Sequence, residues 1–194
     1  MARYDAEHKA ETRRRIIESA GRRLKQDGVD GSGIATLMSD AGLTNGAFYA
    51  HFGSKDDLVA NVVADQLATQ YAVLEALPEG VAALEGFIRD YLAPQHRDTP
   101  GTGCPSAALL DEIARCDDSV RESYTEGMQS IVDVIAAHLS PDDPPAAGTR
   151  AVGLFTLLVA TLQLARAVSD RKLSDDILES GIRNAQTLLD RGNA

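Results

Sequence analysis

The chain has 194 residues, of which 25% are charged, and a formal net charge of −10. Two cysteines and no apolar run near the start exclude a disulfide-rich secreted protein, and we expect no signal peptide. The most apolar stretch, residues 151–165, is shorter than the roughly 20 residues that span a bilayer, so we expect a cytoplasmic protein that does not contact membranes.

The negative charge is unevenly distributed. Residues 1–60 contain nine Lys/Arg and nine Asp/Glu, so the whole net charge lies in residues 61–194. A protein that binds nucleic acid needs a basic face rather than a basic chain. The first 60 residues are therefore compatible with DNA binding, and we expect the acidic remainder to face away from DNA.

The first predicted helix runs from about Glu7 to Gln26. Its apolar stripe, at helical spacing, consists of Ile16, Ile17, Ala20 and Leu24. Its other positions are rich in arginine and lysine, but the i,i+4 pairs Glu11–Arg15 and Glu18–Arg22 favour a solvated, ion-paired face. The basic residues nearest the N-terminus are candidates for phosphate contacts: Arg3, Lys9, Arg13 and Arg14.

Two short helical segments follow. The first, Thr36–Leu43, closes at Gly42, a residue type common just after a helix C-terminus. In the second, Phe48 and Phe52 are four residues apart and share one face, whereas Gly46, Ala47 and Ala50 share the opposite face. Small residues on an outer face allow close approach, as in a DNA major groove, although an ordinary surface helix is the alternative.

These segments form a helix-turn-helix pattern, and residues 12–58 resemble the N-terminal domain of the Tet repressor family. The matching residues are Ala20, Leu24 and Gly28, then Ala41-Gly42-Leu43, then 44–58 without a gap. Ser32-Gly33 and Leu37-Met38 depart from the family's usual residues. The resemblance implies an all-α fold with a three-helix DNA-binding head (1–55) and a helical ligand-binding and dimerisation body (56–194).

The resemblance also implies a function. It indicates a repressor that binds a palindromic operator in double-stranded DNA as a homodimer and leaves it when a small-molecule effector binds the body. Tyr49 and Lys55 are expected to contact phosphates. By the same resemblance, the residues facing DNA are Thr44, Asn45, Gly46, Ala47, Tyr49, His51 and Lys55.

The remainder of the chain is predicted to be helical. The expected helices span about Asp57–Leu77, Val81–Leu92, Pro105–Arg115, Ser119–Leu139, Ala146–Val168 and Ser174–Arg191, with breaks at 94–103 and 140–145. The last two are apolar enough to form a four-helix bundle with a partner subunit, as the resemblance implies; a monomer core is the alternative. Candidate effector-binding residues are Phe87, Tyr91, Cys104, Leu109, Tyr124, Met128, Phe155 and Leu158.

Two other functions stay open. Cys104 precedes Pro105 at a predicted helix start, which favours the reactive thiolate and a redox-sensing regulator, whereas its apolar neighbours favour an inert buried thiol. A helical-bundle enzyme is the second alternative. The four histidines lack metal-ligand spacing and no phosphate loop or nucleophile elbow is present, so we expect no enzyme activity, metal or cofactor.

Overall fold

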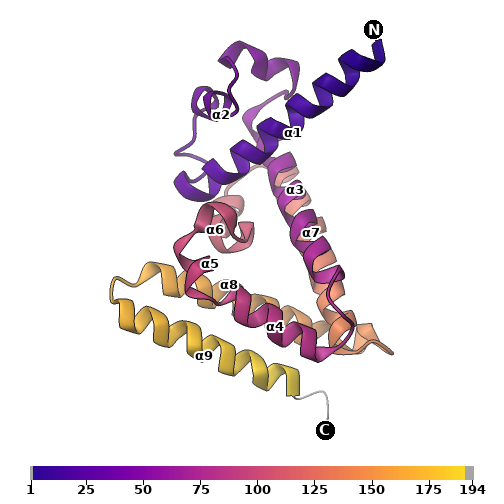
Figure 1. Ribbon diagram of the computed structural model, residues 1–194, viewed down its shortest axis with the longest axis vertical. Helices are drawn as coiled ribbons and strands as arrows, with labels where there is room; N and C mark the ends of the chain where they lie inside the picture. Colours follow the sequence, from indigo (N-terminus) through magenta and orange to yellow (C-terminus); the bar gives the residue numbers. More distant parts are fainter. Residues whose placement is uncertain (1, 191–194) are drawn as a thin grey trace.

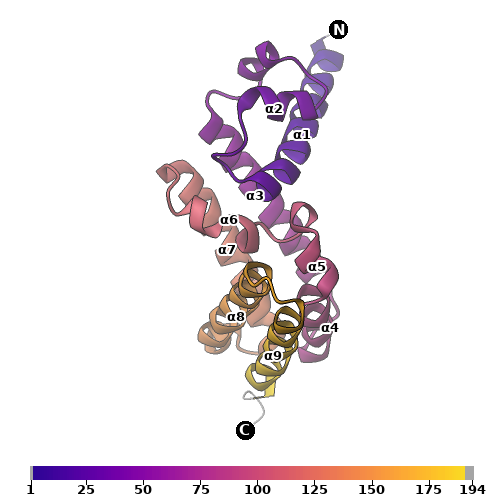
Figure 2. The same ribbon diagram turned by 90° about the vertical axis from the view of Figure 1, so that its left-hand side faces the viewer.

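The computed structural model describes residues 2–190, with side chains from residue 7 onward, and this described part contains helices and turns but no strand (Figure 1). The predicted all-α fold, with a helical head and a helical body, is confirmed. The head lies at one end of an elongated molecule and the last two helices at the other (Figure 2). The head elements are α1 (Ala2–Asp27), α2 (Ile34–Asp40) and the 3₁₀-helix η1 (Asn45–Ala50).

The head has a small core that follows the predicted apolar pattern. Ile16 and Leu24 of α1, Leu37 of α2 and Phe48 of η1 are all fully buried. Glycines with positive φ end both helices, at +80° for Gly28 and +69° for Gly42, where a side chain would be strained. Ser32-Gly33 precedes α2 where the family usually has threonine residues. The helix begins after Gly33 without a side-chain cap.

The body is built on two long neighbouring helices, α3 (Lys55–Glu75) and α7 (Asp118–Leu139), of which α3 leads out of the head (Figure 1). Ser54 caps α3 by accepting a hydrogen bond from the Asp57 backbone N–H at 3.0 Å. The remaining body helices are α4 (Val81–Tyr91), α5 (Pro94–Asp98), α6 (Pro105–Ile113), α8 (Gly148–Ala167) and α9 (Arg171–Asp190).

Some predicted boundaries were wrong. The stretch 94–103, expected to be a break, contains α5 and the 3₁₀-helix η2 (Pro100–Thr102), because a proline suits the first position of a helical turn. The second break likewise contains the 3₁₀-helix η3 (Pro144–Ala147). The first helix begins earlier than predicted, and the predicted end of the last helix, Arg191, lies outside the described residues.

One helical stretch, Pro144–Ala167, is long and apolar enough by length and composition to cross a membrane. In the structure, α8 within this stretch packs against α7 and α9. Leu154, Leu158 and Leu162 of α8 are at most 1% exposed and belong to the body's core. One face of α8 therefore belongs to the core, whereas 39% of the apolar window as a whole is buried.

Candidate DNA-binding surface and effector cavity

The predicted DNA-facing residues lie together at the far end of the head. Thr44, Asn45, Gly46 and Tyr49 are exposed, with Tyr49 at 72%, and the other three, Ala47, His51 and Lys55, are half-buried. The element that carries them is a 3₁₀-helix, in which the Ala47 N–H donates to the Thr44 carbonyl at 3.0 Å. Short helical segments commonly adopt this tighter winding.

The outer face of η1 is held in place by aromatic contacts behind it. The rings of Phe48 and Phe52 lie 5.7 Å apart, and Phe48 also meets Tyr49 edge-on at 5.2 Å. The Arg13 guanidinium lies over the Phe52 ring, 4.7 Å from its centroid, which fixes α1 against this turn. The predicted anchoring by Phe48 and Phe52 is confirmed, and both rings are buried.

Lys55 is engaged within the protein. Its Nζ donates to the Val29 carbonyl at 2.5 Å and so connects the start of α3 to the loop after α1. A phosphate contact would require this ammonium to share or leave that carbonyl. The predicted contact of Lys55 with DNA therefore stays a prediction.

The charges on α1 are paired differently from the expectation. Arg14 forms ion pairs with Glu11, at 2.7 Å, and with Glu18, at 2.5 Å. The predicted pairs Glu11–Arg15 and Glu18–Arg22 were therefore wrong. The Arg14 side chain contacts the residue three positions before it and the residue four positions after it, because both lie on the same helix face. The side chain of Arg3 lies outside the described residues.

A positive cluster remains beside η1. The pKa of His51 is held below its usual range, mainly by burial and to a smaller extent by the nearby cations of Lys9 and Arg13. Nδ1 of His51 is buried and has no hydrogen-bond partner in the described structure. A nearby phosphate would compensate these charges.

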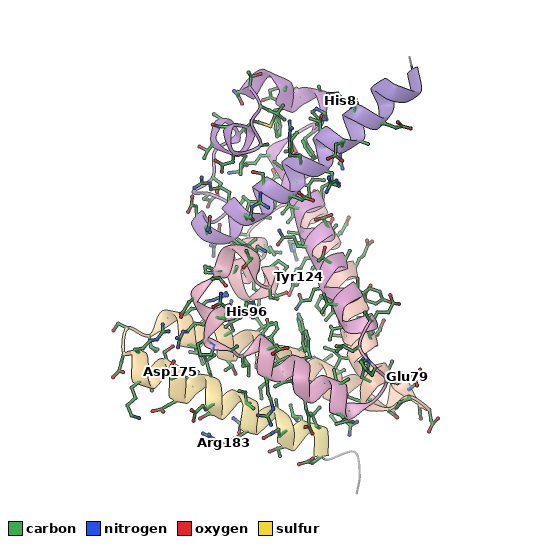
Figure 3. All side chains as sticks on the ribbon, in the orientation of Figure 1. His8, Glu79, His96, Tyr124, Asp175 and Arg183 are labelled. Atoms are coloured by element: carbon green, nitrogen blue, oxygen red, sulfur yellow. The ribbon has the colours of Figure 1, made fainter. Side chains whose placement is uncertain are left out.

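A cavity of about 680 Å³ lies between head and body, which is within the range of small-molecule sites. Residues of α1, α3, α4 and the segment from α5 to α6 line it. His96 and Tyr124, labelled in Figure 3, lie in the region between α1 above and α4 below. Of the eight predicted effector-binding residues, Phe87, Tyr91 and Cys104 line this cavity.

The other five predicted effector-binding residues do not line it. Leu109, Phe155 and Leu158 are buried in the core of the body. Tyr124 and Met128 are half-buried on α7, and the Tyr124 hydroxyl donates to Ser106 Oγ at 3.1 Å. Apolar residues that fill a core and those that line a pocket share the same sequence pattern, so the sequence could not separate them.

Cys104 is the N-cap of α6 with Pro105 just after it, as predicted, and is 5% exposed. Its backbone N–H donates to His96 Nε2 at 3.0 Å, and its thiol donates to Gln70 Oε1 at 3.3 Å. Nδ1 of His96 bonds the Tyr91 carbonyl at 2.7 Å, so the neutral His96 ring carries its proton on Nδ1. Burial lowers the pKa of His96, which favours this form.

Sequence reasoning did not select the polar residues that line this cavity apart from Tyr91 and Cys104, and those it missed include Lys25, Gln66 and His96. Lys25 was noted only as part of a basic helix. Its Nζ donates to the Gly103 carbonyl at 2.8 Å, across 78 residues of chain. No local pattern reports a contact over that separation.

The described residues contain no group of three or more His, Cys, Asp or Glu that could hold a metal ion. Cys104 and Cys116 are both free thiols. Cys116 lies beyond the end of α6 at Ile113, so the two do not share one unbroken helix.

Comparisons with known proteins agree most closely on the head. Residues 16–62 match the model of the family described as bacterial regulatory proteins, tetR family. The HTH-type transcriptional regulator AcrR of Shigella flexneri is 37% identical over 62 residues, 32% of this chain and 29% of AcrR. The HTH-type transcriptional regulator TtgR of Pseudomonas putida is 42% identical over 59 residues, 30% of this chain and 28% of TtgR. These alignments thus cover less than a third of the relatives' own length.

Two further similarities extend into the body. The HTH-type transcriptional repressor NemR of Escherichia coli is 25% identical over 138 residues, 66% of this chain and 67% of NemR. The crystal structure of the reduced form of E. coli NemR matches with a TM-score of 0.77 at 18% identity, covering 91% of this chain and 96% of that chain.

SCO4454, a TetR-family transcriptional regulator from Streptomyces coelicolor, has a TM-score of 0.71 at 19% identity, covering 95% of this chain and 97% of that chain. At these identities the structures show a common fold from head to body. Residues 16–62 therefore match the helix-turn-helix domain of the tetR family of bacterial regulatory proteins, and the whole chain shares its fold with TetR-family regulators.

Proposed function

We propose that the protein is a cytoplasmic DNA-binding transcriptional repressor that binds a palindromic operator as a homodimer and is released by a small-molecule effector. The observation that carries this proposal is the exposed face of η1, held outward by Phe48 and Phe52 beside the cluster of Lys9, Arg13 and His51. Small exposed residues followed by Tyr49 suit docking into a major groove. We propose no catalytic role.

The homodimer is supported by an uncovered face of α8. Val152, Thr156, Ala160 and Leu164 follow at four-residue spacing and are all exposed, with Leu164 at 58%. Exposed large apolar side chains on one face mark protein interfaces. Leu158 of the same helix, predicted as an effector-binding residue, lies on the opposite side and is buried in the subunit's own core.

Release would follow from a change in the separation of the two heads. A dimer reading successive major grooves must hold them about 34–36 Å apart. The effector cavity is lined by α1 of the head as well as by α3 and α4. An effector that binds better to a wrongly spaced dimer shifts the population away from DNA.

Selection of bound fragments from a randomised DNA pool tests the DNA-binding part. We expect enrichment of a palindrome with half-sites about 10 base pairs apart, centre to centre. The matched variant Phe52→Ala loses the ring under Arg13 and should enrich nothing, whereas Lys172→Ala on α9 should select the same palindrome. No enrichment by the native protein would contradict the proposal.

A second function, thiol-based redox sensing through Cys104, is favoured by one observation. This thiol lines the cavity and stands at the start of α6. The similar E. coli NemR is described in a reduced form. In this version, peroxide would oxidise the Cys104 thiol to sulfenic acid with release of water.

A gel-shift assay on the selected operator separates the two functions. If the effector alone controls release, peroxide leaves the native protein bound and Cys104→Ser changes nothing. If Cys104 is the sensor, peroxide releases the native protein and fails to release Cys104→Ser. Cys116→Ser serves as the control thiol, since Cys116 does not line the cavity.

A further inference from the structure

Lys25 lines the cavity and has no carboxylate partner, and Arg166, which does not line it, lies close enough to lower the pKa of Lys25. Lys25 Nζ donates to the Gly103 carbonyl. The nearby Arg166 guanidinium is half-buried and donates to three carbonyls, those of His96 at 2.8 Å, Ala107 at 3.1 Å and Arg97 at 3.2 Å. Neither side chain forms an ion pair within the described part of the chain. Carbonyl dipoles orient these cations and leave their net charge uncompensated.

The electrostatic surroundings of Lys25 fit this arrangement. Burial, with smaller contributions from Arg166 and Arg22, lowers the pKa of Lys25 to about 8, although Cys104 acts in the opposite direction. Burial likewise lowers the pKa of Arg166. Two partly buried cations that disfavour each other would both be stabilised by one anion between them.

An unpaired polar group lies in the same wall. The Tyr91 hydroxyl is buried and has no hydrogen-bond partner of good geometry in the described structure, although Tyr91 lines the cavity and is only 6% exposed overall. Burial, and then the neighbouring Cys104 thiol, raise the pKa of this hydroxyl, so it stays a neutral donor. Its ring packs edge-on against His96 at 4.7 Å. Gln66 Oε1, also in the wall, is likewise buried without a partner. The Tyr91 O–H is a buried donor without a good acceptor, which is costly, and a ligand oxygen that reaches it would satisfy it, whereas Gln66 Oε1 needs a donor.

The remainder of the cavity differs in character. Val73, Leu77 and Phe87 provide apolar surface along the same cavity, whereas the carboxylates of Asp65 and Asp90 are exposed. Glu18, the third acidic lining residue, is neutralised by Arg14. The cavity lining therefore combines the half-buried cation of Lys25, an apolar wall, and exposed charges of both signs at Arg22, Asp65 and Asp90.

We propose that the effector is an amphipathic organic acid, whose anionic group binds Lys25 and the Tyr91 hydroxyl and whose aromatic or alkyl body packs on Phe87. This inference rests on the proposed effector site and names the chemical class of its ligand. The anion competes with the Gly103 carbonyl for Lys25. Binding thereby weakens a direct connection between α1 of the head and the segment before α6.

Isothermal titration calorimetry of the full-length protein tests the proposal with matched probes. Three apolar bodies, naphthalene, biphenyl and octane, are each offered as a carboxylic acid, as its primary amide and as the corresponding primary amine. We expect at least one acid to bind ten- to a hundredfold more tightly than its amide, and the amines to bind most weakly, since a charge-assisted hydrogen bond contributes about that much.

Variants identify the groups responsible. Lys25→Met should remove the preference for the acid, Lys25→Arg should retain it, and Tyr91→Phe should reduce it about threefold to tenfold. Lys172→Ala on α9, outside the cavity lining, is the control and should leave the preference intact. The proposal is wrong if amide or amine binds as well as the acid, if no acid binds below millimolar concentration, or if Lys25→Met keeps the preference.

DNA binding distinguishes this failure from failure of the proposed function. The selected operator should still be bound by native protein and by Lys25→Arg in a gel shift. If operator binding is normal but no acid binds, the ligand class is wrong and the regulator stands. If the preferred acid binds but the native protein selects no operator, the ligand class stands and the proposed function is wrong.

Discussion

The proposed DNA-binding surface and the proposed effector cavity of this protein are built in opposite ways. Seven predicted DNA-facing residues fall within residues 44–55, a single segment whose geometry is set by two phenylalanines behind it. The cavity draws its lining from residues 18 to 105, on three helices and a connecting segment. A surface carried by one segment leaves a motif in the sequence, whereas a cavity assembled from distant segments leaves only scattered residues.

The largest expected effect is a loss of stability in the core of the head. Phe48→Ala should destabilise the head by about 3–5 kcal/mol, because this fully buried ring would leave a cavity. DNA binding should be lost, and the preferred acid should also bind more weakly, because α1 of the head carries Lys25. Denaturant unfolding followed by circular dichroism, alongside calorimetry, measures both. Tyr49→Ala, at an exposed position, is the control and should change stability by less than about 0.5 kcal/mol.

The second prediction concerns the body's uncovered face. Leu164→Glu should give a folded monomer, because a carboxylate would be buried in the dimer without a partner but exposed in the single chain. Leu158→Glu should instead unfold the body, since Leu158 is 1% exposed within the subunit. Sedimentation velocity with circular dichroism tests both. A Leu164→Glu dimer would show that α8 is not the interface.

A third, smaller effect follows from the lowered pKa of Lys25. If the proposed acid binds the ammonium form, its affinity should fall about tenfold from pH 7 to pH 9, because the pKa of about 8 leaves little charge at pH 9. The groups that share this environment are Arg22, His96, Cys104 and Arg166. Lys25→Arg should flatten the profile. A flat profile for the native protein would remove Lys25 from the site.

The free energy of unfolding should instead rise with pH over part of this range. The folded-state pKa of Lys25 lies below its ordinary value of 10.5, so the charged side chain opposes folding below pH 8. That penalty is relieved progressively as the pH rises from about 8 to 10.5. The tighter anion binding at low pH is therefore not a consequence of a more stable fold at low pH.

The smallest expected effect tests the head's docking. Lys55→Ala should weaken binding to all DNA sequences alike and reduce the slope of log affinity against log salt by about one. The lost bond to Val29 adds a modest destabilisation of the loop after α1. Fluorescence anisotropy at several salt concentrations measures the slope, with Lys172→Ala as control. If the salt slope is unchanged and only the stability falls, Lys55 has a structural role and does not contact DNA.

Sequence reasoning located the head accurately because its information is local. Phe48 and Phe52 had to share a face, and Gly42 had to end a helix, whatever the rest of the chain did. It was less accurate where equivalent local solutions compete. Glu11 pairs with Arg14 rather than Arg15, although both arginines lie about one helical turn away. The segment η1 is a 3₁₀-helix, because so short a segment can form either an α-helical or a 3₁₀ turn.

The sequence by itself determined the helical class, the helix-turn-helix and the position of Cys104 before α6, since each depends on periodicity or on a cap within a few residues. Only the tertiary structure decided that Lys25 reaches Gly103, that Leu158 is core and Leu164 is surface, and that Tyr91 lines a cavity unpaired. Such facts depend on how separate helices pack, and helix packing is fixed by the sum of many contacts between residues distant in the chain.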